Sequence, residues 1–203
     1  MKIVALADDE QWNALIAGNT AVEWIRAGEN FSFDHYTDAA AFFMLQQNAV
    51  YDFTITATPV FINSVITTLQ ELNTPVNVLR INGWQGFMQR PVWEIAGIVD
   101  DNIKTIAEKI SKKIIPVKDK PGLVAAKIIA MIINEAYFAL GEDVSTTNEI
   151  DIAMKLGTNY PYGPFEWAEK MGIKNIFTLL QKLSLSDSRY KPAPALLAAT
   201  QNN

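Results

Sequence analysis

The segment RINGWQGFMQRPVWEIAG, residues 80–97, has the layout of a catalytic segment. An apolar strand leads into a polar, glycine-bearing turn, a proline follows, and Glu94 stands in an apolar run. In this layout the end of the strand supplies a histidine that transfers a proton. The chain has Asn82 there instead, and a carboxamide has no pKa near neutrality with which to act as a general base. The segment therefore raises the question whether the chain is an enzyme or has the framework of one without its chemistry.

Three acids follow the first apolar run, at a place where a nucleotide-binding α/β domain needs bare backbone. Such domains receive a pyrophosphate at a helix N-terminus that is reached through a glycine-rich turn. No glycine occurs from Lys2 through Ala17, and Asp8, Asp9 and Glu10 occupy the turn. Their charges would repel a pyrophosphate, whereas they suit the N-terminal end of a helix dipole. We expect a self-capped helix at this turn and no bound dinucleotide.

The composition is that of a globular protein with a sizeable core. The 203 residues are 49% hydrophobic and 19% charged, and the net charge is −5, which argues against nucleic acid or an anionic membrane as the main partner. The absence of cysteine excludes disulfides, thiolate metal sites and a cysteine nucleophile, and it suits a cytoplasmic location. His35 is the single histidine of the sequence, so a histidine-rich metal site is excluded. We interpret His35 as a structural or surface residue.

Residues 1–118 alternate between expected strands and short helices, which is typical of parallel βαβ units in an open sheet. The predicted strands are 2–7, 29–36, 51–58, 76–82, 93–100 and 114–119. The predicted helices are 38–47, 60–72 and 102–114. We predict a shortened Rossmann-like domain over residues 1–118. Its ligands are expected at the carboxyl ends of the strands, an edge predicted to include the turns at Ala7–Asp9, Ala57–Pro59 and Asn82.

Beyond the Pro121-Gly122 pair, only helical patterns occur, and we predict a helical domain over residues 119–203. The predicted helices are 123–140, a helix that Thr146 and Glu149 open as a capping box and Gly157 ends, 164–171 and 174–183. The tail from Arg189 ends polar and is expected to fray. The stretch 123–140 is nearly long enough to cross a membrane, but its polar residues favour a buried helix of a soluble domain.

The helical half resembles the C-terminal domain of the 3-hydroxyacyl-CoA dehydrogenases. The matching pieces, in the family's order and spacing, are Pro121-Gly122, Asn134-Glu135-Ala136, Ile150-Asp151 with Ala153-Met154 and Gly157, and Gly163-Pro164-Phe165-Glu166. The segment RYKPAPALL also resembles the next segment of that family. The sheet half matches the family's nucleotide domain in outline, as an abridged version.

This resemblance implies NAD-dependent oxidation of a 3-hydroxyacyl-CoA, in which a histidine takes the hydroxyl proton and a glutamate orients that histidine. Glu94 holds the glutamate's place and Asn82 the histidine's. The family's substrate asparagine falls on Ala126, and the arginine beside it falls on Lys127. NAD is thus the cofactor that the resemblance implies, but the replaced residues predict that the chain binds none.

Some assignments stay open. Thr58 is a loose candidate for the family's serine, whereas Ser64, nearest by order, falls inside a predicted helix. Glu94 is either a retained acid of the site or a carboxylate paired with Arg90 or Arg80. Four aromatic residues near these segments either stack on a ligand or pack in the core: Trp84, Phe87, Trp93 and Trp167.

Three functions remain possible from the sequence. The first is a 3-hydroxyacyl-CoA dehydrogenase-like protein that is divergent or catalytically inactive and retains a cleft for an acyl-CoA. The second is a structural or regulatory partner, which forms a homodimer through the helical domain or pairs with an active homologue. The third, a live dehydrogenase with displaced residues, is the one that Asn82 and Ala126 argue against.

Overall fold

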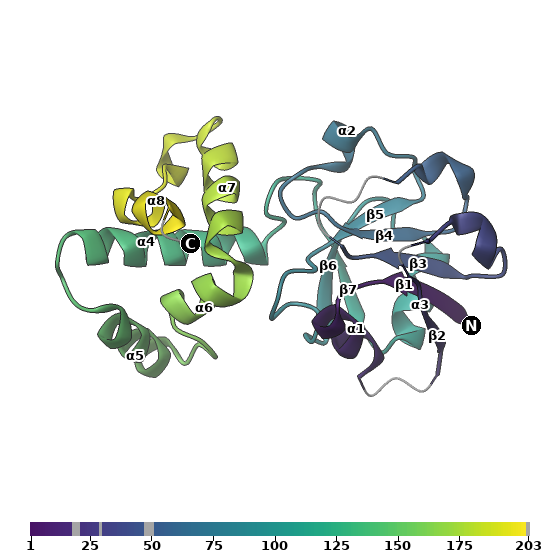
Figure 1. The fold of residues 1–203 in the computed structure, drawn as a ribbon, viewed down its shortest axis with the longest axis horizontal. Helices are drawn as coiled ribbons and strands as arrows, with labels where there is room; N and C mark the ends of the chain where they lie inside the picture. Colours follow the sequence, from purple (N-terminus) through teal and green to yellow (C-terminus); the bar gives the residue numbers. More distant parts are fainter. Residues whose placement is uncertain (18–20, 29, 47–50, 202–203) are drawn as a thin grey trace. The chain divides into compact units, whose positions relative to one another are not determined.

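The computed structural model describes residues 1–17, 21–28, 30–46 and 51–201. The chain divides into two compact units, Met1–Leu123 and Val124–Asn203, which we call the sheet unit and the helical unit (Figure 1). The chain passes from one to the other directly after the Pro121-Gly122 pair.

In the described part of the sheet unit, seven strands form one sheet of order β2-β1-β3-β4-β5-β6-β7. All neighbours run parallel except β5 and β6, which are antiparallel. The strands are β1 Lys2–Leu6, β2 Glu23–Arg26, β3 Ala41–Met44, β4 Val60–Asn63, β5 Val78–Ile81, β6 Val92–Ala96 and β7 Lys113–Pro116. The predicted fold class, an abridged Rossmann-like sheet followed by a helical domain, is confirmed.

One face of the sheet is covered by α1 (Asp9–Ile16) and α3 (Asp101–Lys109). Leu15 of α1 and Ile106 of α3 are buried in the same core cluster as Phe43 of β3. Helix α3 follows the predicted isoleucine periodicity, but it ends at Lys109 because Ser111 takes a left-handed conformation (φ 57°) before β7 begins.

The opposite face is covered by short pieces in place of full crossover helices. These are the 3-10 turns η1 (Phe33–Tyr36) and η2 (Phe53–Ile55) and the four-residue helix α2 (Leu69–Leu72). Their aromatic rings pack on β3, as when Phe33 meets Phe42 edge-on at 4.8 Å between centroids. The predicted strands 29–36 and 51–58 are therefore wrong. Their aromatic residues lie in 3-10 turns and pack on the face of the sheet.

The predicted helices 38–47 and 60–72 are also wrong where the structure has strands. The first contains β3, and the second contains β4 followed by α2. Every residue of β3 and β4 is buried, because both faces of this sheet are covered. A strand buried on both sides shows no alternation of polar and apolar residues, so its pattern resembles that of a buried helix. Glu29 and Gln47, at the ends of two predicted stretches, lie outside the described residues.

The described part of the helical unit consists of α4 Ala125–Gly141, α5 Thr147–Thr158, α6 Pro164–Met171, α7 Ile173–Ser184, η3 Ser188–Tyr190 and α8 Pro194–Gln201. Helix α4 packs against α6, α7 and α8 (Figure 1). Its centre is Ile133, which is fully buried together with Leu179 and Leu180 of α7 and Leu196 of α8. None of the helices in the described ranges combines the length and the apolarity that a bilayer crossing needs.

The ends of the helices follow the predicted capping rules with two corrections. Thr146 and Glu149 form the predicted capping box of α5. Gly157, predicted to end α5, lies inside the helix, and the left-handed cap is Asn159 (φ 56°). The tail that was expected to fray forms α8, because Leu196 is buried against the other helices; the last two residues lie outside the described part of the chain.

Candidate functional site

Asn82 stands directly after β5, at the carboxyl edge of the sheet, and is 9% exposed. Its Oδ1 accepts a hydrogen bond from the backbone N–H of Trp84 at 3.2 Å. Within the described residues its Nδ2 has no hydrogen-bond partner. A buried donor without a partner costs about 1–3 kcal/mol of folding free energy. The packing around Asn82 therefore has to offset the loss of hydration of this amide. The group can donate or accept hydrogen bonds, but it cannot take up a proton near neutral pH.

Glu94 lies on the neighbouring strand, half-buried in the middle of β6. The antiparallel register pairs Arg80 with Ala96 and Ile81 with Ile95. Continued by one residue, this register sets Asn82 opposite Glu94. The residue after β5 and the middle residue of β6 are therefore brought next to one another by this register.

The charge of Glu94 acts on Arg90, whose pKa is lowered by burial and raised in part by this carboxylate. Arg80, the other arginine considered for Glu94, is paired with Asp119 instead. Nearby, burial also lowers the pKa of Lys112, whose Nζ donates to the carbonyl oxygens of Met88 and Arg90 at 2.9 and 3.0 Å. Arg90 and Lys112 thus both lie close to Glu94 or to the loop before β6 and donate hydrogen bonds to backbone carbonyl oxygens.

The turn after β1 is closed by its own side chains. Asp8 caps α1 by accepting from the backbone N–H of Gln11 at 2.8 Å, and Gln11 Oε1 accepts from the N–H of Asp8 at 3.1 Å. Asp9 forms an ion pair with Arg26, at the end of β2, at 2.7 Å. The predicted self-capped helix is therefore confirmed.

Gln11 also spans the carboxyl edge of the sheet. Its Nε2 donates to the carbonyl oxygen of Leu45 at 3.1 Å and to that of Gly83 at 3.2 Å. Asn63 completes the connection, since its Nδ2 donates to Leu45 O at 3.1 Å and its Oδ1 accepts from Gly83 N at 3.0 Å. Gly83 has to lack a side chain, because a Cβ there would stand 2.6 Å from Asn63 Cγ. We call Gln11, Asn63 and Gly83, with the Leu45 carbonyl that they share, the amide clasp.

The amide clasp lies where open α/β sheets bind ligands. The chain reverses its strand order between β1 and β3, and such sheets take ligands in the crevice outside the carboxyl ends at this point. Gln11 follows β1 and Leu45 follows β3. The hydrogen bond between them therefore crosses this crevice.

The remaining sequence candidates lie elsewhere. Thr58 precedes β4 and therefore stands at the amino edge of the sheet, where its carbonyl accepts from Asn77 Nδ2 at 2.9 Å. The prediction that Ala57–Pro59 lies on the ligand edge is wrong, because 51–58 is not a strand. His35 is exposed in η1. Ser64 follows β4 at the same edge as Asn82, and its hydroxyl donates to Thr67 O at 2.7 Å.

Ala126 and Lys127 lie in the first turn of α4 in the helical unit. Ala126 is fully buried and offers only a methyl group. Lys127 is half-buried, with its Nζ 4.8 Å from the centre of the Tyr190 ring. The four aromatic residues with an open role, Trp84, Phe87, Trp93 and Trp167, are all at most 5% exposed and pack in the core.

The motifs that carry the resemblance hold the helical unit together. Asp151, 7% exposed on α5, caps α6 by accepting from Phe165 N at 2.8 Å and Glu166 N at 3.1 Å. Gly163 leaves room for it, because a Cβ there would lie 2.3 Å from Asp151 Cγ. Each of these residue types is thus required by its neighbour.

Asn134 has a similar architectural role on α4. It is 2% exposed, donates to Lys191 O at 3.0 Å and accepts from Ala193 N at 2.8 Å. The amide of Asn134 thus acts as both the donor and the acceptor for the backbone of residues 191–193. These two hydrogen bonds fix the segment before α8 to α4.

Residues 122–203 match the family described as "3-hydroxyacyl-CoA dehydrogenase, C-terminal domain". This match lies within the helical half, and over these residues the chain is similar to 3-hydroxyacyl-CoA dehydrogenases. It is 41% identical over 87 residues to a 3-hydroxyadipyl-CoA dehydrogenase of Escherichia coli, which covers 42% of this chain and 18% of that protein. It is 36% identical over 97 residues to a probable 3-hydroxybutyryl-CoA dehydrogenase of Bacillus subtilis, which covers 47% of this chain and 34% of that protein. The matches thus span well under half of these relatives.

Solved structures extend the likeness of fold to the sheet unit. An (S)-3-hydroxybutyryl-CoA dehydrogenase from Ralstonia eutropha superposes with a TM-score of 0.74 over 99% of this chain and 93% of that one, at 18% identity. A 3-hydroxybutyryl-CoA dehydrogenase from Escherichia coli gives a TM-score of 0.56 and 32% identity over 68% of this chain and 31% of that one. The sheet unit therefore shares the fold of 3-hydroxyacyl-CoA dehydrogenases.

Sequence reasoning missed the amide clasp, and it set Ser64 aside as part of a helix. Asn63 and Ser64 come at the end of the apolar run that begins at Val60, and that position is the available signal for an edge residue; Gln11 follows three acids and has no such signal. Asn63 and Ser64 were placed inside a predicted helix, which concealed their position at the end of β4.

Proposed function

We propose that this protein is a 3-hydroxyacyl-CoA dehydrogenase-like protein that does not itself transfer hydride. The observation that carries the proposal is Asn82, set opposite Glu94 at the carboxyl edge. The family reaction needs a group there that takes a proton from a hydroxyl, and loss of a general base slows a reaction by about 10²–10⁴-fold. Glu94 alone would have to serve, and the nearby charge that it acts on is that of Arg90, which is not an imidazole that it could orient.

The residues at the turn after β1 do not fit a dinucleotide. A pyrophosphate at the N-terminus of α1 would need backbone N–H groups that are free to donate, and the Gln11 N–H is already bound to Asp8. Asp8, Asp9 and Glu10 would place negative charge against it. The side chain of Gln11 would have to break its hydrogen bonds to the carbonyl oxygens of Leu45 and Gly83 before a ligand could enter the crevice. The turn after β1 is therefore not suited to hold NAD.

The assay follows NADH absorbance in the presence of acetoacetyl-CoA, with an active 3-hydroxybutyryl-CoA dehydrogenase as the positive control. We expect no turnover above the rate without protein, and no recovery in Asn82→His, because the cofactor turn would still be closed. Turnover by the unchanged protein, or rescue by Asn82→His alone, would contradict the proposal.

Ligand binding is tested separately by thermal unfolding. A ligand at 100 times its Kd stabilises the folded state by about 2.7 kcal/mol. We expect no shift with NADH. A shift with acetyl-CoA but not with NADH would support a retained acyl-CoA cleft, whereas a shift with NADH would contradict the closed-turn argument.

We propose as a second function that the helical unit joins two copies of this chain. The observation that favours it is α5, whose only buried residue is Asp151. Ile152 and Leu156 of this helix are 44% and 83% exposed, and Tyr160 beyond its end is 39% exposed. A helix of this length is marginal in water unless an apolar face packs against something. A self-association surface on α5 would supply that packing.

The test is the mass of the protein in solution, measured by light scattering after size-exclusion chromatography. We expect a dimer that Leu156→Glu converts to a monomer. Leu185→Glu is the matched control, since Leu185 is 87% exposed at the end of α7 and should leave the dimer intact. A monomeric unchanged protein, or equal effects of both substitutions, would refute a second copy as the partner of α5.

A further inference from the structure

Arg80 is a fully buried cation in the middle of the sheet. It lies on β5 between Leu79 and Ile81, with 0% of its surface exposed. Its side chain points to the face that holds Val78, a face otherwise made of apolar residues. A charge in such a place is costly unless it is paired and hydrogen-bonded. The position of its partners therefore shows what this arginine holds together.

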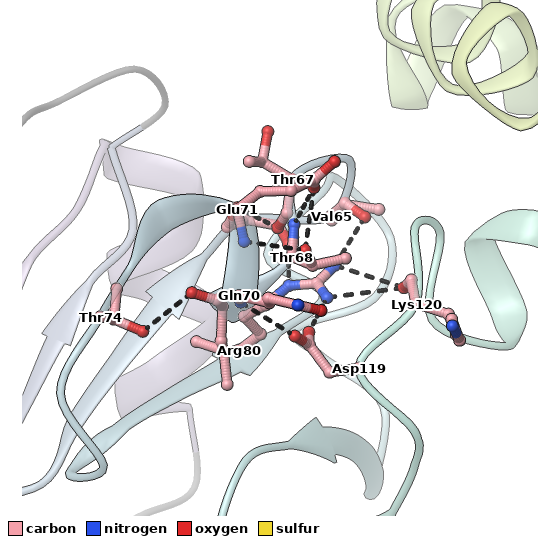
Figure 2. A network of polar contacts seen from close by, with 11 residues as sticks. Val65, Thr67, Thr68, Gln70, Glu71, Thr74, Arg80, Asp119 and Lys120 are labelled. Atoms are coloured by element: carbon pink, nitrogen blue, oxygen red, sulfur yellow. Dashed lines mark hydrogen bonds and ion pairs between the residues drawn. The ribbon is translucent and has the colours of Figure 1, made fainter. Parts of the chain in front are cut away.

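The guanidinium group binds two segments that are far apart in the sequence. Nε donates to Ser64 O at 2.6 Å and Nη2 to Val65 O at 2.9 Å, both in the loop after β4. Nη1 forms an ion pair with Asp119, and two nitrogens lie 3.5 Å from Lys120 O. Figure 2 shows the guanidinium between this loop on one side and Asp119 and Lys120 on the other. Burial lowers the pKa of Arg80, and the Asp119 carboxylate opposes that shift.

Asp119 and Lys120 begin the connector that leads out of the sheet unit. The other oxygen of Asp119 accepts from Gln70 N, in α2, at 3.3 Å. Gly122 N donates at 2.8 Å to Val65 O, the same carbonyl that Arg80 binds. The connector is thus attached at both of its ends to the loop and helix that follow β4.

The connector then leaves through two left-handed residues. Gly122 has φ 81° and Leu123 has φ 49°, directly before α4. A left-handed conformation is uncommon for leucine and persists where the surroundings hold it. The hydrogen bond of Gly122 and the ion pair of Asp119 are the contacts that can hold it here.

We propose that Arg80 is a positioning residue that fixes the connector, Asp119–Leu123, to the sheet unit. Its guanidinium joins the loop after β4 to the connector, so the point at which the chain leaves the sheet is set by the interior of the sheet. This inference is independent of the proposed function, because it needs neither substrate nor cofactor. The competing explanation is that Asp119 only neutralises a buried charge, in which case the connector would keep its conformation without Arg80.

The experiment replaces Arg80 by methionine, which keeps the length and removes the charge and the donors. Lys104→Met is the matched control, since Lys104 forms an exposed ion pair with Asp101 in α3. Two readouts report on the connector: amide hydrogen exchange at Gly122 and Gln70, and the rate of tryptic cleavage after Lys118. Loss of a hydrogen bond to a charged group corresponds to about a tenfold or larger change in an opening equilibrium.

We expect Arg80→Met to raise exchange at Gly122 and cleavage after Lys118 by about tenfold or more, with Lys104→Met unchanged. Asp119→Asn is the second variant, which serves if Arg80→Met does not fold, and it should loosen the same amides. Exchange in α7 should stay the same in all variants. A lower unfolding midpoint with unchanged exchange at Gly122 would overturn the proposal and leave Arg80 as a residue of the core only.

Discussion

Replacing Gly163 by alanine is a sharp test of how the helical unit is built. The backbone of Gly163 is extended (φ −74°, ψ 167°), so alanine adopts it without strain. The added Cβ would lie 2.3 Å from Asp151 Cγ and Oδ1 and 2.4 Å from Asp151 Cβ, all closer than real contacts allow. Asp151 therefore has to move away from the N-terminus of α6.

The magnitude is set by the contacts that Asp151 would lose. Its two bonds, to Phe165 N at 2.8 Å and Glu166 N at 3.1 Å, each join a charged acceptor and are worth about 1.5–3 kcal/mol. Partial relaxation and the smaller entropy of the unfolded alanine chain, about 0.4–1 kcal/mol, reduce the loss. We expect Gly163→Ala to lower the free energy of unfolding by roughly 2–4 kcal/mol.

The assay is urea unfolding of the four members of a double-mutant cycle, followed by far-UV circular dichroism. In the Asp151→Ala background there is no carboxylate to displace, so Gly163→Ala should cost less than about 1 kcal/mol, roughly the cost of alanine at a helix N-cap. Gly157→Ala is the matched control, because no atom lies within 4 Å of its added Cβ and it sits inside α5. It should stabilise the protein by up to about 1 kcal/mol. Equal costs of Gly163→Ala in both backgrounds would refute the steric argument.

Three further predictions concern the same unit. Asn134→Ala should lower the free energy of unfolding by about 2–4 kcal/mol, because Lys191 O and Ala193 N would be left without their buried partner; amide exchange in α8 should rise with it. Thr146→Ala removes one half of a capping box and should cost about 1 kcal/mol, measured by urea unfolding, with exchange rising in the first turn of α5. The hydrogen bond from Lys155 holds the pKa of Glu166 below its ordinary value of 4.5, so this carboxylate stabilises the fold above that value and the contribution is lost as the pH falls below it. Glu166→Gln should accordingly flatten the fall of the urea midpoint between about pH 5 and pH 3.

The parts of the fold that could be predicted are those whose pattern is periodic. Helix α3 was found from its isoleucines three and four apart, α4 from its long apolar run, and α5 from its capping box, whereas α8 was missed because the tail was expected to fray. Strands β3 and β4 were mistaken for helices because all of their residues are buried and no alternation remains. The aromatic runs at η1 and η2 have strand-like composition, and only the tertiary structure shows that they cover β3.

The site was predictable only in part for a related reason. Asn82 and Glu94 were singled out one by one, but their juxtaposition depends on β6 running antiparallel to β5, and parallel units were expected. Thr58 was assigned to the carboxyl edge because residues 51–58 were predicted as a strand that ends there. In the structure Thr58 comes before β4 and lies at the amino edge. Arg80 and Asp119 are 39 residues apart, and no local pattern connects them.

The residues that make this chain recognisable are architectural, and this limits what the resemblance can imply about chemistry. Asn134, Asp151 and Gly163 each satisfy a buried backbone group or leave room for the side chain that does. These contacts serve the packing of the helices and need neither a substrate nor a cofactor. Asn82 and the amide clasp belong to the sheet unit and are not among the motifs that carry the resemblance. The resemblance and the catalytic chemistry therefore depend on different residues in this chain, and assays directed at the sheet edge test the chemistry.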